Sequence, residues 1–323
     1  MERTVECPMC HGPELRVFKE YRIDAPAKKE MHEVLENMPY LEQRLWILFE
    51  RVLPGTNFLS LETVLCETCG FLFSNPRFTT RELHVLNETM NEFIVVRKHV
   101  PKKRPLKTKE RSRRIYRLIS QFQSTRDSKR EILDYGGAQG YNLYAFSQAG
   151  DACYMLDPAR WHLPSNVQYM GVDISDLPDD QLFDVILACH VYEHVDDPGR
   201  LIEETLRHLS SHGILYIEVP LGSFREWKWP NEPTTHINFF SEQPLFHFFQ
   251  HTDLHILHLS TKYQWVTEGK MWCVNLVAGK EEGKTISTCK TTLQQMKNPA
   301  WLVTRAMQKF WRISRETFFR KTK

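Results

Sequence analysis

Short apolar runs recur through the middle of the chain, and amphipathic segments separate several of them. Five runs have the length of buried strands: Glu131–Tyr135, Ala152–Leu156, Val167–Val172, Phe183–Cys189 and Ile214–Val219. Helical patterns lie at Tyr141–Ala149 and from about Pro198 to Leu209. Strands that alternate with helices favour a parallel sheet with crossover helices. We therefore expect an α/β domain with a doubly wound, mostly parallel sheet.

Two further apolar runs follow, His255–Tyr263 and Met271–Ala278. The few residues between them leave no room for a crossover helix, so this last pair should be antiparallel. The total is then seven strands. Upstream, helical patterns occupy residues 28–53 and 107–122, the second of them strongly basic.

These patterns divide the chain into four parts. We expect an N-terminal module over residues 1–96 that contains a helical insertion, and a basic linker and helix over 97–130. The α/β domain should span 131–280, and a basic amphipathic tail should occupy 281–323. The length of 323 residues suits one large or two modest domains.

Charge and hydropathy exclude few functions. The net charge is only +2, so the chain as a whole is not drawn to nucleic acid. No stretch reaches the roughly 18 apolar residues of a membrane span, and the first residues lack the apolar core of a signal peptide. We expect a cytoplasmic protein whose cysteines are thiols or metal ligands.

Four of the eight cysteines form two C-x-x-C pairs. Cys7 and Cys10 make the first pair, and Cys66 and Cys69 make the second. Each pair presents two thiolates from one tight turn, and two pairs complete a tetrahedral zinc shell. The alternative is two coincidental pairs of reduced cysteines. A closed four-sulfur site has no open position, so we expect a structural zinc ion and not a catalytic one.

A glycine-rich loop follows the first strand of the α/β domain. It runs Asp134-Tyr-Gly136-Gly137-Ala-Gln-Gly140 and opens the first helix. Glycines let the backbone approach a ligand, and the helix N-terminus offers free amides. Asp157 ends the second strand, where a carboxylate accepts ribose hydroxyls. Asp173 and Ile174 follow the third strand, placed to meet an adenine amine and its ring face.

Together these stretches resemble class I S-adenosylmethionine-dependent methyltransferases, which have a Rossmann-like fold. The resemblance rests on the glycine loop, on Leu156-Asp-Pro158, and on the segment from His190-Val-Tyr-Glu-His194 to Gly213-Ile-Leu-Tyr-Ile-Glu-Val-Pro220. It spans about residues 131–280. It implies that Gly136, Gly137 and Gly140 line the cofactor loop, with Asp134 bracing it. Asp157 would bind ribose, Asp173 and Ile174 would face adenine, and His190 would border the cofactor.

The N-terminal module extends the resemblance. Cys66-Glu-Thr-Cys-Gly-Phe-Leu-Phe-Ser-Asn-Pro-Arg77 is similar to the zinc-binding module of sugar and polysaccharide-cluster methyltransferases, including C-methyltransferases of deoxysugar nucleotides. In that branch the same module precedes the same catalytic domain. The resemblance therefore implies a sugar or nucleotide sugar as acceptor, with zinc and S-adenosylmethionine as cofactors.

Candidate catalytic groups follow the fourth and fifth strands, at the edge of the sheet where ligands bind. Tyr192 and His194 follow the fourth strand, and His236 follows the fifth. His236 lies in an element similar to the His-x-x-x-Phe-Ser of the family, whose histidine is the base in C-methylating members. Those members carry Glu before this His, where this chain has Thr235. That departure leaves O-, N- and C-methylation open, and a histidine that caps the following helix is the structural alternative.

Three basic segments bear on partners. The run 97–114 is dominated by Lys and Arg, with Glu110 its single acid, and suits a solvated linker or a phosphate-binding surface. Phe224–Pro230 suits either stacking and phosphate binding or a lid. The tail from Pro299 suits packing on the protein, a second subunit or peripheral contact with the inner face of a membrane. An RNA methyltransferase and a catalytically silent cofactor-binding subunit are the competing functions, with nucleic acid the weaker partner.

Overall fold

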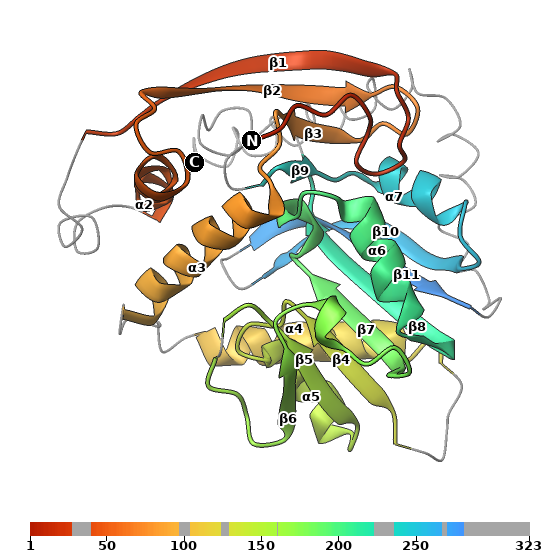
Figure 1. The fold of residues 1–323 in the computed structure, drawn as a ribbon. Coiled ribbons are helices and arrows are strands. Elements are labelled where there is room, and N and C mark those ends of the chain that lie inside the picture. Colours follow the sequence, from red (N-terminus) through yellow and green to blue (C-terminus); the bar gives the residue numbers. More distant parts are fainter. Residues whose placement is uncertain are drawn as a thin grey trace, which may run out of the picture.

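The computed structural model describes residues 1–27, 40–96, 104–123, 129–159, 161–222, 236–266 and 270–280. Several predictions lie outside these residues: the tail 281–323, the aromatic and basic segment Phe224–Pro230, Thr235, and parts of the helical and basic segments at 28–39 and 97–103. A seven-stranded sheet lies below a four-stranded sheet in the view of Figure 1.

The large sheet has the strand order β10-β11-β8-β7-β4-β5-β6. Its strands are β4 (Glu131–Tyr135), β5 (Ala152–Leu156), β6 (Val167–Gly171), β7 (Phe183–Cys189), β8 (Leu209–Pro220), β10 (His255–Trp265) and β11 (Lys270–Gly279). The neighbouring strands β6, β5, β4, β7 and β8 are parallel to one another, and β11 is antiparallel to both of its neighbours. The predicted seven-stranded, mostly parallel sheet is confirmed. The single reversed strand is β11, since β10 runs in the direction of β8.

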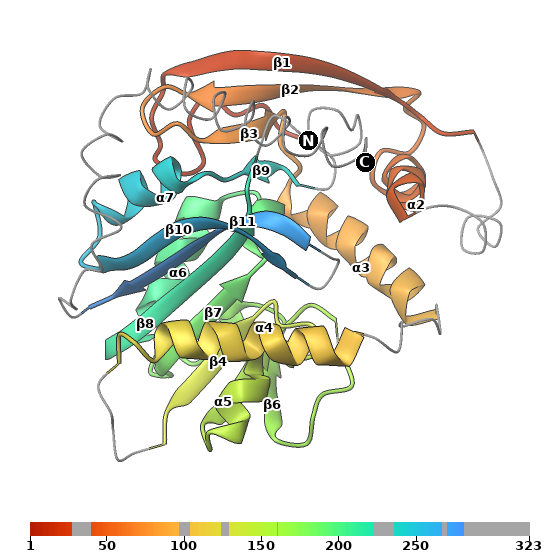
Figure 2. The same cartoon turned by 180° about the vertical axis from the view of Figure 1, so that it is seen from behind.

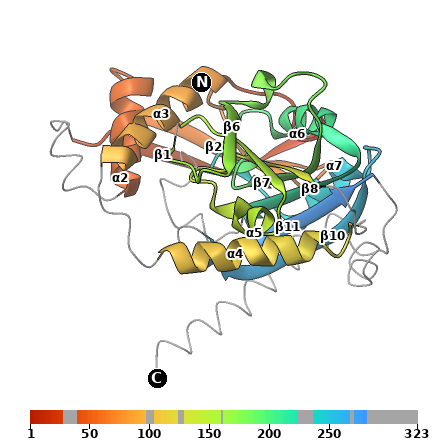
Figure 3. The same ribbon diagram turned by 90° about the horizontal axis from the view of Figure 1, so that it is seen from below.

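Helices cover both faces of this sheet, as doubly wound folds require. α4 (Arg104–Ile119) runs along one face, and α6 (Pro198–Arg207) lies on the other (Figure 3). α5 (Tyr144–Gln148), preceded by a 3-10 turn at Tyr141–Leu143, packs on the side of α4. Ile115 and Ile119 of α4 are fully buried against this face.

The small sheet has the order β1-β2-β3-β9 and is antiparallel throughout. Its strands are β1 (Leu15–Asp24), β2 (Phe58–Cys66), β3 (Leu72–Asn75) and β9 (Asn238–Phe239). α2 (Tyr40–Ile47), a π-helical turn (Leu48–Val52) and α3 (Thr80–Val96) flank it, as Figure 2 shows from behind. The apolar side chains of the helices, β1 and β2 form a core of their own.

One strand of the small sheet comes from the far end of the sequence. β9 begins 163 positions after the end of β3 (238 − 75), yet Phe73 pairs with Asn238 and Leu72 pairs with Phe239. The cysteine region also shares one apolar core with the α6 face of the large sheet, which joins Phe71 to Ile186 and Ile217. The N-terminal module and the α/β domain are therefore packed into one unit, although the sequence predicts a boundary near residue 96.

The fifth parallel strand starts earlier than predicted. β8 begins at Leu209, so residues 210–213 extend the strand where the sequence suggests the end of a helix. Phe183 pairs with Leu209 and Val185 with Ile214, and this register shift accommodates the extra residues. α7 (Glu242–Phe249) follows β9, and 3-10 turns lie at Ile174–Asp176 and Tyr192–His194. In the described part of the chain, no helix is long and apolar enough to cross a membrane.

Candidate functional site

The glycine loop leaves β4 in a left-handed conformation. Gly136 has φ +67° and Gly140 has φ +68°, which side chains rarely adopt. A Cβ atom on Gly136 would stand 2.7 Å from Cγ2 of Val191. The loop therefore packs directly on the segment that follows β7, so the cofactor loop and the first candidate catalytic residues are neighbours.

Asp134 supports this loop from inside. Its carboxylate is fully buried, accepts a hydrogen bond from Asn142 Nδ2 at 3.1 Å, and lies 2.5 Å from where a Cβ atom on Gly137 would be. Burial raises the pKa of Asp134 to about 7. The side chain is thus placed beneath the loop, as a brace would be.

Asp157 faces the loop from the end of β5. Its Oδ2 accepts a hydrogen bond from the Ala138 amide at 2.8 Å, and Oδ1 accepts from the Ala159 amide at 2.8 Å and from Trp161 Nε1 at 3.0 Å. Burial raises the pKa of this carboxyl, against these hydrogen bonds. A carboxylate offers about four acceptor positions, so a ribose hydroxyl has room beside two amides but competes with Trp161. The sequence carries no signal for this tryptophan.

Asp173 and Ile174 have different surroundings. Asp173 accepts hydrogen bonds from Tyr135 Oη and from the Ile174 amide, both at 2.6 Å, and caps the 3-10 turn. The side chain of Ile174 is almost fully buried and belongs to the core of the α6 face. Core residues cover the side chain of Ile174, so in this structure it is not exposed to contact an adenine ring as expected.

His190 stands at the start of the loop after β7, in a left-handed backbone conformation with φ +61°. Its Nδ1 lies 3.2 Å from Oε1 of Glu193, and its Nε2 lies 3.5 Å from Oε1 of Glu218. Burial lowers the pKa of His190, but a hydrogen bond with Cys273 and the contacts with the two carboxylates outweigh it and raise this pKa well above its usual value. His190 thus connects two buried acids beside the glycine loop.

Glu218 is the centre of a buried ion network. It projects from β8 and pairs with Arg111 at 2.5 Å and with Arg114 at 2.7 Å, both from α4. Arg111 also donates to Asn142, which in turn donates to Asp134. The pKa of Glu218 is lowered despite its complete burial, mainly by Arg111. In the sequence, the signal that could have predicted this network is Glu218 itself, a charged residue in the otherwise apolar run Ile214–Val219.

Glu193, His194 and His236 form the other end of the site. One ligand atom from each lies within 4.8 Å of the other two. The rings of His194 and His236 are 4.9 Å apart, and His194 Nε2 is 3.8 Å from Glu193 Oε1. Glu193 is fully buried, and its imidazole neighbours lower its pKa to about 2 against the effect of burial. The structure thus brings two of the predicted catalytic residues together with a carboxylate.

Tyr192 does not belong to this group. It is fully buried, its hydroxyl donates to Thr205 Oγ1 at 3.4 Å, and burial raises its pKa well above the usual value. The prediction of a catalytic role for Tyr192 is wrong, because its side chain points into the core beneath α6. Its neighbours in sequence turn the other way, since residues 192–194 form a 3-10 turn.

A buried arginine holds the two segments of this cluster together. Arg77 Nη2 donates to the carbonyl of Val195 at 3.1 Å and to Asn238 Oδ1 at 2.8 Å, and Nε donates to the carbonyl of Asp196 at 2.8 Å. Asn238 Nδ2 donates in turn to the carbonyls of Tyr192 and Val195, at 2.7 and 2.6 Å. Arg77 belongs to the N-terminal module, so this module helps to position His236.

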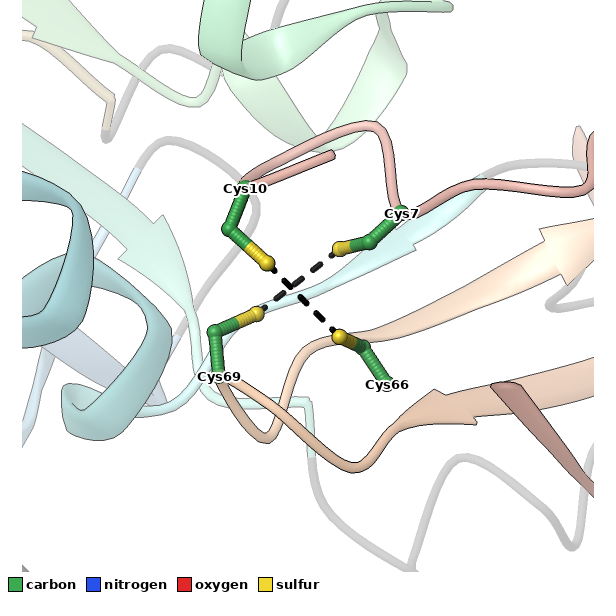
Figure 4. Close-up of side chains that lie close together, drawn as sticks. All are labelled: Cys7, Cys10, Cys66 and Cys69. Carbon is green, nitrogen blue, oxygen red and sulfur yellow. Dashed lines mark hydrogen bonds between the residues drawn. The ribbon is translucent and has the colours of Figure 1, made fainter. Parts of the chain in front are cut away.

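The four paired cysteines converge in space, as Figure 4 shows. Cys7 Sγ lies 3.7 Å from Cys69 Sγ, and Cys10 Sγ lies 3.7 Å from Cys66 Sγ. Four sulfurs around a zinc ion at about 2.3 Å are about 3.8 Å apart. The residues therefore fit a tetrahedral zinc ion. Three of the four are fully buried, which leaves no position for a substrate.

Comparison with known proteins adds a family to this geometry. Residues 108–259 match a family described as a methyltransferase domain. Residues 108–259, just under half of the chain, are therefore similar to a methyltransferase domain. Over 79 residues it is also 32% identical to the mitochondrial ubiquinone biosynthesis O-methyltransferase of Candida albicans. That match covers 23% of this chain and 24% of the relative, so it spans about a quarter of either protein.

Several solved structures are similar in fold to this chain. The 1,6-didemethyltoxoflavin-N1-methyltransferase of Burkholderia thailandensis, solved with 1,6-didemethyltoxoflavin and S-adenosylhomocysteine, is 13% identical, with a TM-score of 0.49. The match covers 69% of this chain and 96% of that one. An S-adenosylmethionine-dependent methyltransferase of Methanosarcina mazei is 17% identical, with a TM-score of 0.41, over 50% of this chain and 96% of that one.

The strand order confirms the predicted doubly wound, Rossmann-like sheet, and the family match supports its interpretation as a methyltransferase domain. The sugar-specific branch, the individual cofactor contacts and the zinc ion stay predictions.

Proposed function

We propose that the protein transfers a methyl group from S-adenosylmethionine to a small-molecule acceptor, and that this acceptor is a sugar or nucleotide sugar of glycan biosynthesis. The main support is the contact between two parts of the site: Gly136 of the glycine loop packs on Val191, within the segment that carries His190 and His194. A loop suited to the cofactor thus adjoins groups suited to an acceptor.

The cofactor supplies a methyl group on a sulfonium, which reacts by in-line displacement. The residues of the chain have to hold it in position. In this proposal the backbone of Gly136, Gly137 and Gly140 borders the methionine end, Asp157 accepts the ribose hydroxyls, and Asp173 faces adenine. His190 keeps the loop after β7 in place from the opposite side, through its contacts with Glu193 and Glu218.

His236 and His194 are the groups proposed to face the acceptor. Either imidazole is suited to bind an acceptor hydroxyl or to take its proton. The resemblance implies a carboxylate at position 235 that this chain lacks. Glu193 lies beside both histidines and is ionised, so its charge is available to stabilise an imidazolium at this place.

The cysteine cluster has a structural role in the proposal. Gly199, near the start of α6, donates its amide to the carbonyl of Pro8 at 3.1 Å, so the first cysteine turn rests on the methyltransferase domain. A zinc ion in this place would hold the module whose Arg77 orients the acceptor side. We expect the protein to act in the cytoplasm.

The structure offers less support for RNA as the substrate. Arg111 and Arg114 belong to the basic segment, yet both side chains point inward to Glu218. At least this part of the positive charge serves folding and does not form a surface for phosphates.

Binding of S-adenosylhomocysteine, measured by calorimetry, tests the cofactor side. We expect Asp157→Ala to weaken binding at least tenfold, while Asp180→Ala, at an exposed acid, leaves it unchanged. Labelled methyl groups from S-adenosylmethionine should then enter the sugar-nucleotide or glycan pool of an extract from the source cells, and His236→Gln should abolish this labelling. Label in RNA would overturn the proposed acceptor. Cofactor binding without any label would indicate the silent subunit.

A further inference from the structure

Glu193 is a carboxylate without hydrogen bonds in the interior of the protein. It is 1% exposed, and neither carboxylate oxygen has a hydrogen-bond partner. Its contacts are ionic: His190 Nδ1 at 3.2 Å and His194 Nε2 at 3.8 Å from Oε1. A buried carboxylate normally accepts hydrogen bonds or binds a cation. His190 supplies one positive charge beside Oε1, and Oε2 has neither a hydrogen bond nor an ion pair among the described residues.

We infer that Glu193, His194 and His236 bind a divalent metal ion, at a site separate from the four cysteines. One carboxylate and two imidazoles are the ligand set of catalytic zinc sites and of other open sites for first-row metals. Their ligand atoms lie within 4.8 Å of one another. Two ligands at about 2.1 Å from a tetrahedral ion are about 3.4 Å apart, so the ligand atoms would approach one another by up to about 1.4 Å when the ion binds.

The backbone around these ligands is already held in place. The Ile237 amide donates to the Glu193 carbonyl at 3.0 Å, which ties the segment of His236 to that of Glu193. Asn238 and Arg77 add the side-chain hydrogen bonds described above. Ligands on segments fixed in this way suit a preorganised site. His190 contacts Glu193 from behind, as the outer partner of a ligating carboxylate does.

A neighbouring group of possible ligands makes a useful contrast. His190, Glu218 and Cys273 also lie within 4.8 Å of one another. There, however, Glu218 is already neutralised by Arg111 and Arg114, and both guanidinium groups would repel a cation. No arginine or lysine is paired with Glu193 among the described residues. The cationic neighbour of Glu193 is His190, which it shares with Glu218, whereas Glu218 has two guanidinium groups in addition. The metal ion should therefore select Glu193.

Three protein ligands leave at least one position open on the ion. If the proposed function holds, this position faces an acceptor oxygen, because the site adjoins the glycine loop through Val191. With His194 and His236 bound to the ion, they would hold the ion in place of taking the acceptor proton themselves. A hydroxyl bound to the ion would lose its proton to solvent more readily, which favours acceptors with a hydroxyl group. Metal binding itself can be measured without knowing the acceptor.

The test is a metal titration of the full-length protein with zinc retained at the cysteines and weakly bound ions removed by mild chelation. Mn²⁺ prefers oxygen and nitrogen ligands to thiolates, so free Mn²⁺, followed by electron paramagnetic resonance, reports the new site alone. Zn²⁺ is titrated in parallel and should reach two ions per chain. We expect one Mn²⁺ per chain, and at least a tenfold weaker affinity in Glu193→Gln and in His236→Gln.

His255→Gln, at an exposed histidine at the start of β10, is the matched control and should bind Mn²⁺ as the natural protein does. Circular dichroism verifies that each variant is folded, and His236→Gln keeps the test valid if Glu193→Gln does not fold. Zinc that stops at one ion per chain, with no Mn²⁺ bound, overturns the inference, as does binding that neither variant weakens. S-adenosylhomocysteine binding separates the two hypotheses: its loss alone counts against the proposed function, and loss of metal binding alone counts against the metal site.

Discussion

The proposed cofactor side and the proposed acceptor side of the site are built in different ways. The cofactor side comes from one continuous stretch, in which β4, β5 and β6 each end in an acid or a glycine turn: Asp134, Asp157 and Asp173. The acceptor side is assembled from three distant segments, which are Arg77, residues 190–196 and residues 236–239.

This difference explains the place of the N-terminal module. Parallel strands bring the cofactor residues together at one sheet edge without outside help. The loop that carries His236 has no such frame of its own. It is held because β9 joins the small sheet and because Arg77 binds the backbone at Val195 and Asp196. The module is therefore part of the proposed acceptor side.

The largest expected effect comes from the cysteine cluster. Cys66→Ser removes one proposed zinc ligand, and structural zinc contributes about 10 kcal/mol to folding in small zinc domains. We expect the module to unfold and hydrogen exchange to rise first in β3 and β9, with β4 and β5 protected for longer. Exchange measured by mass spectrometry and zinc content test this. Cys153→Ala, at a buried cysteine outside the cluster, should keep its zinc. A uniform rise across both sheets would contradict the comparison.

The second effect concerns the cofactor side and its dependence on pH. The pKa of Asp134 is about 7 in the folded protein and about 4 when unfolded. The folded state therefore keeps this proton longer, and the contribution of Asp134 to the free energy of unfolding falls as the pH rises from 4 to 7. Three pH units correspond to about 4 kcal/mol. Asp134→Asn should remove this part of the decline in urea unfolding between pH 4 and 8. Parallel curves for both proteins would show that the buried carboxyl is not protonated.

A third effect tests the arginine that connects the two regions. Arg77→Met leaves two carbonyls and Asn238 without their donor, and each buried group left unpaired costs about 1–3 kcal/mol. We expect a loss of roughly 3 kcal/mol in urea unfolding, and weaker Mn²⁺ binding with unchanged affinity for S-adenosylhomocysteine. Arg16→Met removes a surface ion pair with Glu67 and should cost less than about 1 kcal/mol. Equal loss of cofactor affinity in Arg77→Met would show that the two sides are not independent.

The smallest effect is local to Asp157. Trp161 donates to the oxygen that a ribose hydroxyl would also use, so cofactor binding should displace its indole. We expect a change in tryptophan emission when S-adenosylhomocysteine binds, which Trp161→Phe removes. The affinity should change by less than tenfold, because Asp157 keeps its two amide donors. An emission change that persists in the variant would locate the signal in another tryptophan.

Much of the methyltransferase domain was predictable because its signals are local. The apolar runs that predict β4, β5 and β7 have the same bounds as the observed strands, and the glycine loop follows β4 as the pattern requires. The two cysteine pairs were also predicted to lie close together, since each pair supplies only two of the four ligands of a zinc site. Tyr192 shows the limit: its position beside His194 suggested chemistry, but the 3-10 turn points it into the core.

The sequence by itself determined the class of the fold, the glycine loop and the cysteine pairs, because periodic apolarity and short-range spacing encode them. Only the tertiary structure decided that β9 completes the small sheet, that Arg111 and Arg114 turn inward to Glu218, and that Glu193 meets His194 and His236. The physical reason is that these contacts join residues about 40 to 165 positions apart. Such contacts depend on which buried charges find partners once the sheets have packed, and no local pattern records that outcome.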